Sequence, residues 1–299
     1  ARTVVIENAP NVDWEDLCHD DTYIYIADFG NNAGSRTNLR VYRVLISDYL
    51  NTPNDTISAD TISFDYADQT DFTPSSFSTN YDAEAIISLD NNLYIFTKNW
   101  GDMWTNIYAL PKIPGNYSIP RIDSIDVEGF ITGASFNTSS NSVMLSGYAF
   151  TYPFIVEISN FSNAQFSLGT INREQIQLPS GYSYQLEGIS PIGESNYYIS
   201  TEESFSGTSG LFRLHSFPTN SLSEQYTTSY SIYPNPSSDY LHIFHPAIAK
   251  VDLYNSCGKL ITSTTNQSID ISDFSSGVYL ALLSDVNGKV ISREKIMIK

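Results

Sequence analysis

The chain has 299 residues, of which 13% are aromatic and 16% charged, and 21 residues are tyrosine. This composition is typical of a folded, β-rich protein with one large and one small domain, and it excludes an intrinsically disordered chain. The formal charge of −18 excludes nucleic acid as a favourable partner, because an acidic surface repels phosphate groups, although it suits divalent cations. No apolar run approaches the ~20 residues of a membrane-spanning helix, so no transmembrane segment is expected.

Four loosely similar segments follow one another over residues 1–215. Each begins with an alternating apolar run, passes through a turn of Asp, Asn, Ser or Gly, and enters a strand rich in Tyr and Ile. The corresponding positions, spaced 69, 49 and 54 residues apart, are Glu15, Glu84, Gly133 and Glu187. Further short strands follow in each segment. Four strands in every ~40–50 residues predict the blades of a β-propeller over residues 1–215.

The first and last parts of this region differ from the other repeats. The fourth repeat lacks a fourth strand, whereas the opening run RTVVIE (residues 2–7) is a strand without a blade. We therefore expect the opening strand to pair with the last repeat and close the ring, since closure removes exposed sheet edges. The strand count predicts four blades, or five if an upstream blade is missing.

Blade geometry indicates where a site would form. The start of a blade's first strand and the end of its second strand lie on one face near the central axis. In three repeats the first position is acidic (Glu15, Glu84, Glu187) and the second is polar (Asp28, Lys98, Glu202). We expect a ligand-binding or ion-binding site formed by Glu15, Asp28, Asn31, Asn32, Glu84, Glu187 and Glu202. The alternative is that these side chains only cap loops or bond neighbouring blades.

The loop after Asp28 suggests one kind of ligand. The carboxylate of Asp28 and the amide oxygens of Asn31 and Asn32 are hard donors of the kind that Ca²⁺ prefers. The loop is not an EF-hand, because it lacks the alternating Asp or Asn residues and the final Glu. A calcium ion held by Asp28 and Asn31 is one hypothesis, and a simple turn is the alternative. No other cofactor is indicated.

Ligand binding without catalysis is the preferred interpretation of residues 1–215. The second is a hydrolase or lyase acting on a polysaccharide or phosphoester, with Glu84, Glu187 or Glu202 as acid or base and Lys98 stabilising negative charge. The chain contains no nucleophile-elbow serine motif, phosphate loop or His-Glu-x-x-His motif. The third is a scaffold or adhesin whose propeller only presents loops.

The last part of the chain has its own organisation. Residues 216–231 are polar and aperiodic, which predicts a linker. Short alternating strand patterns separated by NSCGK, DFSSG and VNGK then predict a small immunoglobulin-like β-sandwich over residues 232–299. YPNP fits the entrance of this domain, because proline is tolerated at the start or edge of a strand.

Several motifs occur in a fixed order within this domain. They are Tyr233-Pro234-Asn235-Pro236, Gly258-Lys259, Gly277-Val278-Tyr279 and the basic and apolar end from Lys295 to Lys299. Together they resemble the type A C-terminal sorting domain of the type IX (Por) secretion system of Bacteroidetes. The resemblance implies passage through the periplasm, recognition by the type IX translocon and its outer-membrane shuttle protein, and a final location outside the cell or on its surface. It also implies cleavage of the domain, with release or attachment to surface lipopolysaccharide.

The N-terminal repeats carry a weaker resemblance. The runs DWED, DFGNN and EGI are similar to those of a group of secreted bacterial β-propellers without an established activity. This second resemblance supports the fold and implies no particular reaction.

Overall fold

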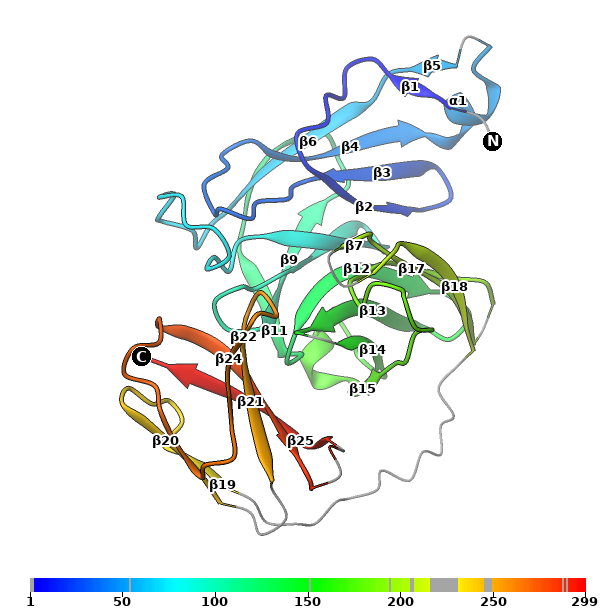
Figure 1. Cartoon of the computed structure of the whole chain (residues 1–299). Coiled ribbons are helices and arrows are strands. Elements are labelled where there is room, and N and C mark those ends of the chain that lie inside the picture. Colours follow the sequence, from blue (N-terminus) through cyan, green and yellow to red (C-terminus); the bar gives the residue numbers. More distant parts are fainter. Residues whose placement is uncertain are drawn as a thin grey trace. The chain divides into compact units, whose positions relative to one another are not determined.

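The computed structural model describes residues 3–53, 55–150, 152–193, 195–204, 207–215, 231–244, 249–286, 288 and 290–299. In these ranges the chain is all-β apart from the short helices α1 (Ile46–Asn51) and η1 (Phe166–Leu168). The chain divides into two compact units, Ala1–Ser216 and Phe217–Lys299, which we describe separately (Figure 1). Apart from Ser231, the predicted linker of residues 216–231 lies outside the described residues.

Four small sheets follow one another along unit 1. Sheet 1 contains, in spatial order, β10 (Gly115–Ile119), β6 (Asp60–Tyr66), β4 (Leu39–Leu45), β3 (Tyr23–Asp28) and β2 (Trp14–His19). Sheet 2 contains β11 (Arg121–Asp126), β9 (Trp104–Pro111), β8 (Asn92–Thr97) and β7 (Ala83–Leu89). Sheet 3 contains β12 (Phe130–Asn137), β13 (Ser142–Ala149), β14 (Tyr152–Ser159) and β15 (Thr170–Gln175). Sheet 4 contains β16 (Leu186–Pro191), β17 (Asn196–Thr201) and β18 (Gly210–His215).

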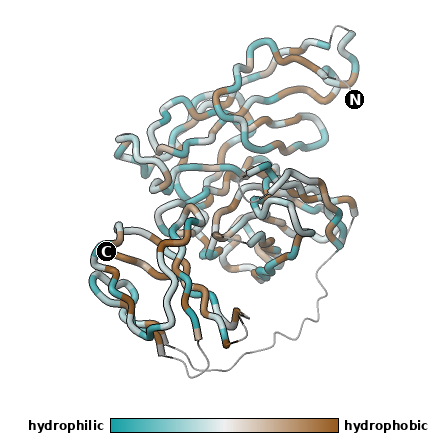
Figure 2. Tube along the Cα trace, in the orientation of Figure 1, coloured by the Kyte–Doolittle hydropathy of each residue, from teal (hydrophilic) through white to brown (hydrophobic). Residues whose placement is uncertain are grey.

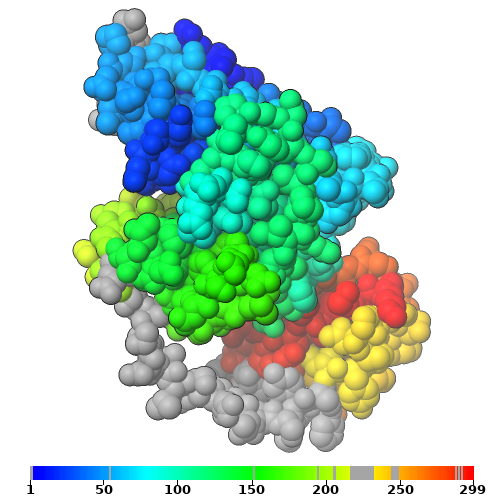
Figure 3. Space-filling model, turned by 180° about the vertical axis from the view of Figure 1, so that it is seen from behind, coloured from blue at the N-terminus to red at the C-terminus, as the bar shows by residue number. Residues whose placement is uncertain are grey.

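The sheets of unit 1 pack through their first strands. β2 lies beside β7, β7 beside β12, and β12 beside β16. Figure 3 shows this succession in space-filling form, from the blue residues of sheet 1 through the cyan and green residues of sheets 2 and 3. Apolar residues are frequent along the strands of unit 1 (Figure 2), and every residue of β13 is buried, so this strand is covered on both faces. Tyr25 of sheet 1 shares a core with Ile86 of sheet 2, and Trp100 lies 4.6 Å from Phe130 of sheet 3 between ring centroids. Unit 1 is therefore propeller-like.

The expected pairing of the opening strand with the last repeat is wrong. β1 (Val5–Ile6) pairs in parallel with β5 (Thr56–Ile57), a short strand that follows α1. Val4 and Ile6 pack with Ile57 against the outer face of sheet 1, so the opening strand buries a nearby apolar face instead of closing a ring. The repeats also did not predict β10, which extends sheet 1 by pairing in parallel with β6.

Each first strand carries a β-bulge at the same place. The bulge contains Glu15 and Asp16 in sheet 1, Glu84 in sheet 2, Thr132 in sheet 3 and Glu187 in sheet 4. A bulge adds one residue that has no partner across the strand pair and re-aims the local side chains. The third repeat therefore aligns at Thr132, one residue before the predicted Gly133.

The bulge residue Asp16 ties three sheets together. One carboxylate oxygen accepts hydrogen bonds from the backbone N–H of Ile86 in β7 (3.0 Å) and of Ala134 in β12 (3.3 Å). Burial raises the pKa of Asp16 to about 7, although its hydrogen bonds to backbone N–H groups oppose this shift. At the next interface Thr132 donates a hydrogen bond to the carbonyl of Leu186 in β16. The bulges thus supply polar contacts between sheets that otherwise pack through apolar side chains.

Unit 2 contains two sheets over one core. The first contains β19 (Ser231–Tyr233), β20 (Tyr240–Phe244) and β23 (Ser268–Asp270). The second contains β22 (Leu260–Thr264), β21 (Lys250–Asn255), β24 (Gly277–Ser284) and β25 (Val290–Ile298). Leu241 and Ile269 of the first sheet lie in one buried cluster with Leu253 and Ile296 of the second.

The side chain of Asn235 attaches its segment to β25 through two hydrogen bonds of the kind that a neighbouring strand would form. The Asn235 amide donates to the carbonyl of Lys295 (2.7 Å) and accepts from the N–H of Met297 (2.8 Å). Ser237 continues the pairing, because its N–H donates to the Met297 carbonyl (2.9 Å) and its carbonyl accepts from the N–H of Lys299 (2.8 Å). Proline has no backbone N–H, so the Asn235 amide provides the donor that the flanking prolines lack.

Asp16→Ala should destabilise unit 1 by roughly 2–4 kcal/mol, because two backbone N–H groups between the sheets lose their acceptor. Urea unfolding followed by tryptophan fluorescence reports on this unit, since it contains all three tryptophans, Trp14, Trp100 and Trp104. Asp21→Ala removes an exposed carboxylate and is the matched control. Equal unfolding free energies for the two variants would contradict the role assigned to Asp16.

Asn235→Ala should destabilise unit 2 by roughly 1–3 kcal/mol, because it removes both side-chain bonds to β25. Asn235→Asp should be at least as damaging, since it places a second acceptor against the Lys295 carbonyl. Hydrogen exchange of the β25 amides in the full chain should become roughly tenfold faster or more in both variants. Asn266→Ala removes an exposed amide and serves as the control. Unchanged exchange in the Asn235 variants would show that this contact does not stabilise β25.

Candidate functional site

A buried ion pair from sheet 2 lies at the centre of the candidate site. Lys98 Nζ is 2.7 Å from Glu84 Oε1, and the two side chains are only 6% and 8% exposed. Glu84 is the bulge residue of β7 and Lys98 directly follows β8, so these two strand ends lie together. The ammonium group also lies 4.7 Å from the ring centroid of Trp100 and 5.2 Å from that of Tyr148.

The surroundings of Lys98 keep it charged. Burial alone would lower its pKa, but Glu84, followed by Tyr148 and Glu187, raises the pKa above the usual value for lysine. Two aromatic faces and one carboxylate therefore hold a permanent ammonium group inside the unit.

Carboxyl groups of sheets 1 and 4 surround this ion pair. Burial, reinforced by the charge of Glu84, raises the pKa values of Glu15 and Glu187 to about 9 each, and a hydrogen bond with Glu202 adds to the shift of Glu187. Burial also raises the pKa of Glu84 to about 7, against the attraction of Lys98. Glu15 and Glu187 therefore hold protons at neutral pH. We call Glu15, Glu84, Lys98, Glu187 and Glu202 the axial cluster.

The residues of the axial cluster differ in how exposed they are to solvent. Glu84 and Lys98 are buried, Glu15 and Glu187 are half-buried, and Glu202 is exposed. The carboxyl groups that hold protons are thus intermediate in exposure between the enclosed ion pair and Glu202.

Asp82 holds groups beside the axial cluster in place through two hydrogen bonds. Asp82 accepts hydrogen bonds from the backbone N–H of Asn31 (2.7 Å) and from the indole N–H of Trp100 (2.8 Å). Burial raises the pKa of Asp82, although Lys98 opposes the shift. Asp82 therefore links the loop after β3 to Trp100, whose ring packs on Lys98.

Gly30 allows two carboxyl groups to approach the backbone. A Cβ atom at this position would lie 2.0 Å from Glu15 Oε1 and 2.5 Å from Asp13 Oδ2. Both distances are shorter than real Cβ contacts, so any larger residue would displace these carboxyl groups.

The loop predicted to hold calcium is bound to other protein groups. Asp28 is fully buried and forms ion pairs with Arg36 (3.1 Å) and Arg40 (3.3 Å). The Asn31 amide donates to the carbonyl of Tyr81 (3.0 Å) and accepts from the backbone N–H of Arg36 (2.9 Å). These contacts provide a structural role for Asp28 and Asn31.

The calcium hypothesis gains no geometric support in this loop. The backbone carbonyl of Asn32 accepts from the N–H of Phe77 (3.2 Å), and the residue is half-buried. Across the described ranges, no group of three or more His, Cys, Asp or Glu side chains is placed to hold a metal ion. A cation site at Asp28 and Asn31 would have to displace the arginines that already neutralise the carboxylate.

Asp28 and Lys98, which the sequence prediction aligned, do not occupy equivalent positions in their sheets. Asp28 lies opposite Trp14, the residue before the bulge, whereas Lys98 lies one residue beyond the corresponding position in sheet 2. The residues equivalent to Lys98 are Phe29 in sheet 1, Tyr148 in sheet 3 and Glu202 in sheet 4. Asp28 therefore does not belong to the axial cluster.

Sequence reasoning missed Asp82, Gly30 and Tyr148. A partial signal for Asp82 was present, because Asp-x-Glu occurs at Asp13–Glu15 and at Asp82–Glu84, although a third copy, Asp126–Glu128, lies at the end of β11. No comparable signal marked Tyr148, since its repeat has Thr132 in place of the acidic bulge residue.

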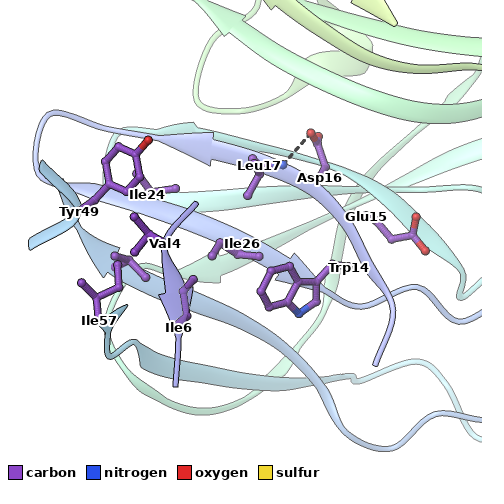
Figure 4. Close-up of a pocket in the computed structure, with 11 residues that line it drawn as sticks. Val4, Ile6, Trp14, Glu15, Asp16, Leu17, Ile24, Ile26, Tyr49 and Ile57 are labelled. Carbon is purple, nitrogen blue, oxygen red and sulfur yellow. Dashed lines mark hydrogen bonds between the residues drawn. The ribbon is translucent and has the colours of Figure 1, made fainter. Parts of the chain in front are cut away.

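A separate groove lies on the outer face of sheet 1 (Figure 4). Its volume is about 530 Å³, and Ile24, Ile26 and Val4 contribute to its mainly apolar lining. In Figure 4 the side chain of Glu15 points away from this apolar floor. Glu15 thus borders the groove while its carboxyl group belongs to the axial cluster.

The motifs of the C-terminal region occupy defined positions in unit 2. Gly258 has a φ of 72° in a turn closed by a hydrogen bond from the Lys259 N–H to Asn255 Oδ1 (2.9 Å). Gly277 begins β24, and the next two side chains, Val278 and Tyr279, are buried. Lys295 and Lys299 lie at the contact with the Asn235 segment.

These residues also match a family model. Residues 231–299 fit the secretion system C-terminal sorting domain. They form a sorting domain of the type IX secretion system. A protein that carries this sorting domain is delivered to the cell surface or the exterior. None of the helices in the described part of the chain is long and apolar enough to cross a membrane.

Solved structures resemble the chain distantly. The match to PorZ, a surface component of the type IX secretion system of Porphyromonas gingivalis, has 12% identity and a TM-score of 0.37, and it covers 96% of this chain but only 39% of PorZ. PQQ-bound aldose sugar dehydrogenase from Streptomyces coelicolor has 11% identity and a TM-score of 0.32, over 72% of this chain and 96% of that protein. Apo AztD from Citrobacter koseri has 11% identity and a TM-score of 0.29, over 96% of this chain and 72% of AztD. These similarities are too distant to indicate an activity. No curated protein matches the chain.

The raised pKa values predict that the axial cluster costs stability at alkaline pH. The pKa values of Glu15 and Glu187 are about 9 in the folded chain and 4.5 in the unfolded one, so their stabilising contribution is lost as pH rises between these values. Glu15→Gln/Glu187→Gln should therefore raise the free energy of unfolding by roughly 2–4 kcal/mol at pH 8 and by far less at pH 4.5.

Urea unfolding followed by tryptophan fluorescence at both pH values measures this difference. Glu7→Gln changes an exposed carboxylate and should leave the pH dependence as it is in the wild type. A double variant with an unchanged pH dependence would show that Glu15 and Glu187 are ionised at neutral pH.

Proposed function

We propose that this chain is a type IX secretion cargo whose N-terminal unit binds a cationic ligand at the axial cluster. In this proposal residues 1–215 form a four-bladed β-propeller, and residues 232–299 form an immunoglobulin-like sandwich that the translocon and its shuttle protein recognise. Attachment to surface lipopolysaccharide after cleavage belongs to the same proposal.

The observation that carries the ligand proposal is the excess of acidic groups over positive charge in the axial cluster, which contains four glutamates and one lysine. Burial, followed by the charge of Glu84, keeps protons on Glu15 and Glu187 up to a pH of about 9, and the attraction of Lys98 offsets only part of these shifts. A cationic ligand would supply the missing charge, lower these pKa values and displace the protons.

The position of Lys98 indicates which cation would fit. Its ammonium group lies between the Glu84 carboxylate and the rings of Trp100 and Tyr148, which is an environment suited to amines. We therefore favour a ligand that carries an amino group. Calcium assistance is the other form of the proposal, because carboxylates are also ligands for Ca²⁺ once they have lost their protons.

A hydrolase or lyase acting on a polysaccharide is the second candidate. It is favoured by one observation, the unequal pKa values of Glu187 (about 9) and Glu84 (about 7), since an acid and a base need different protonation states. Release of reducing ends from a polysaccharide by the wild type, lost in Glu187→Gln, would support this candidate.

Isothermal titration of the full chain tests the ligand proposal, with spermidine and calcium chloride as separate probes. Spermidine should bind at pH 7 with proton release, measured by comparing buffers of different ionisation enthalpy, and release should decrease at pH 9. Glu187→Gln should weaken binding by about tenfold and release fewer protons, because the amide cannot ionise.

Glu7→Gln is the matched control and should bind as the wild type does. Binding of calcium but not spermidine would support the calcium form. Binding of neither probe, or proton release that Glu187→Gln leaves unchanged, would refute the proposal.

A further inference from the structure

Three aromatic rings form a row on the outer face of the β19–β20–β23 sheet. Tyr233 of β19 lies opposite His242 of β20, and Tyr240 lies two residues earlier in β20, so all three side chains project from the same face. The ring centroids are 5.6 Å apart for Tyr233 and His242, and 6.4 Å apart for the stacked pair Tyr240 and His242. We call these three residues the aromatic row.

The aromatic row does not contribute to the core of unit 2. The alternate residues of β20, Leu241 and Ile243, project to the opposite face and are buried. Tyr233 and Tyr240 are 53% and 51% exposed, and His242 is also exposed. Single exposed aromatic residues are ordinary, but a contiguous row of them marks an interaction site.

Polar side chains flank the row and give it a second kind of contact. A depression of about 490 Å³ is lined by Tyr233, His242 and Ile243 together with Asn266, Gln267 and Ser268. Ser268 lies opposite His242 in the sheet, and Asp270 lies opposite Tyr240. Hydrogen bonds from Ser272 lower the pKa of the Asp270 carboxyl group, and a hydrogen bond from Tyr240 adds to this shift.

We infer that the aromatic row binds a glycan chain. Sugar rings present C–H faces that stack on aromatic rings, and hydroxyl edges that exchange hydrogen bonds with amides and hydroxyl groups such as those of Asn266, Gln267 and Ser268. Among the described residues that line the depression there is no lysine or arginine, which disfavours a phosphate or another anion. The row and its polar flank therefore fit a neutral polysaccharide, either free or linked to lipid.

Calorimetric titration of the full chain tests this inference. Laminarihexaose and cellohexaose serve as free oligosaccharides, and delipidated lipopolysaccharide supplies the polysaccharide of a lipid-linked source. The wild type should bind at least one of these probes. Tyr233→Ala and Tyr240→Ala should each weaken that binding by about tenfold or more, because each removes a stacking surface.

Two further variants make the test specific. Tyr233→Phe retains the ring and should bind within about threefold of the wild type. Tyr198→Ala removes a tyrosine that is 45% exposed in unit 1, and it should leave glycan binding unchanged. Hydrogen exchange in β24 and β25 verifies that the alanine variants in unit 2 remain folded.

Two results would contradict the inference that the aromatic row binds a glycan. If the wild type binds none of the probes at millimolar concentration, or if the alanine variants bind as well as it does, the aromatic row is not a glycan site. Loss of export in folded Tyr233→Ala and Tyr240→Ala, without glycan binding by the wild type, would assign the row to a protein partner in secretion. None of these results depends on the axial cluster, because the row lies in the other unit.

Discussion

One extra residue in each first strand controls both the packing and the chemistry of unit 1. At this bulge Asp16 joins β2 to β7 and β12 through backbone N–H groups, and Thr132 joins β12 to β16. The same bulges bring Glu15, Glu84 and Glu187 toward one another. A regular ladder would pair these residues across the strands. The polar contacts between sheets and the carboxyl groups of the site therefore have a common structural origin.

In the axial cluster the carboxyl groups of the proposed binding site are also the groups that reduce stability. Glu15 and Glu187 are held where ionisation is unfavourable, and one lysine offsets only part of the negative charge. Such an arrangement reduces stability as the pH rises, unless a ligand supplies positive charge. A fold selected for stability alone would replace these carboxyl groups with neutral residues. Their presence is consistent with a binding site, and it links occupancy of that site to the stability of the unit.

Much of the architecture could be predicted, because strand alternation and turn residues are local properties. The four sheets of unit 1 follow the four repeats, and Glu84 meets Lys98 because strand ends determine which residues share a face. The errors arose where a non-local contact decided the outcome. Asp28 is equivalent to Thr97 of sheet 2 and not to Lys98, and its carboxylate pairs with two arginines that follow it in the chain. The opening strand pairs with β5 and packs against the apolar outer face of sheet 1, which no pattern within residues 2–7 could reveal.

The attachment of Asn235 to β25 has a consequence for the order of biosynthesis. Asn235 lies at the entrance of unit 2, whereas Lys295 and Met297, to which it bonds, belong to its last strand. The ribosome must therefore translate the chain through β25 before this contact can form. Chains interrupted earlier lack the partner for Asn235 and for Ser237, and their sorting domain has no closed edge at this strand. The sorting domain can therefore form all of its contacts only in chains that have been translated through β25.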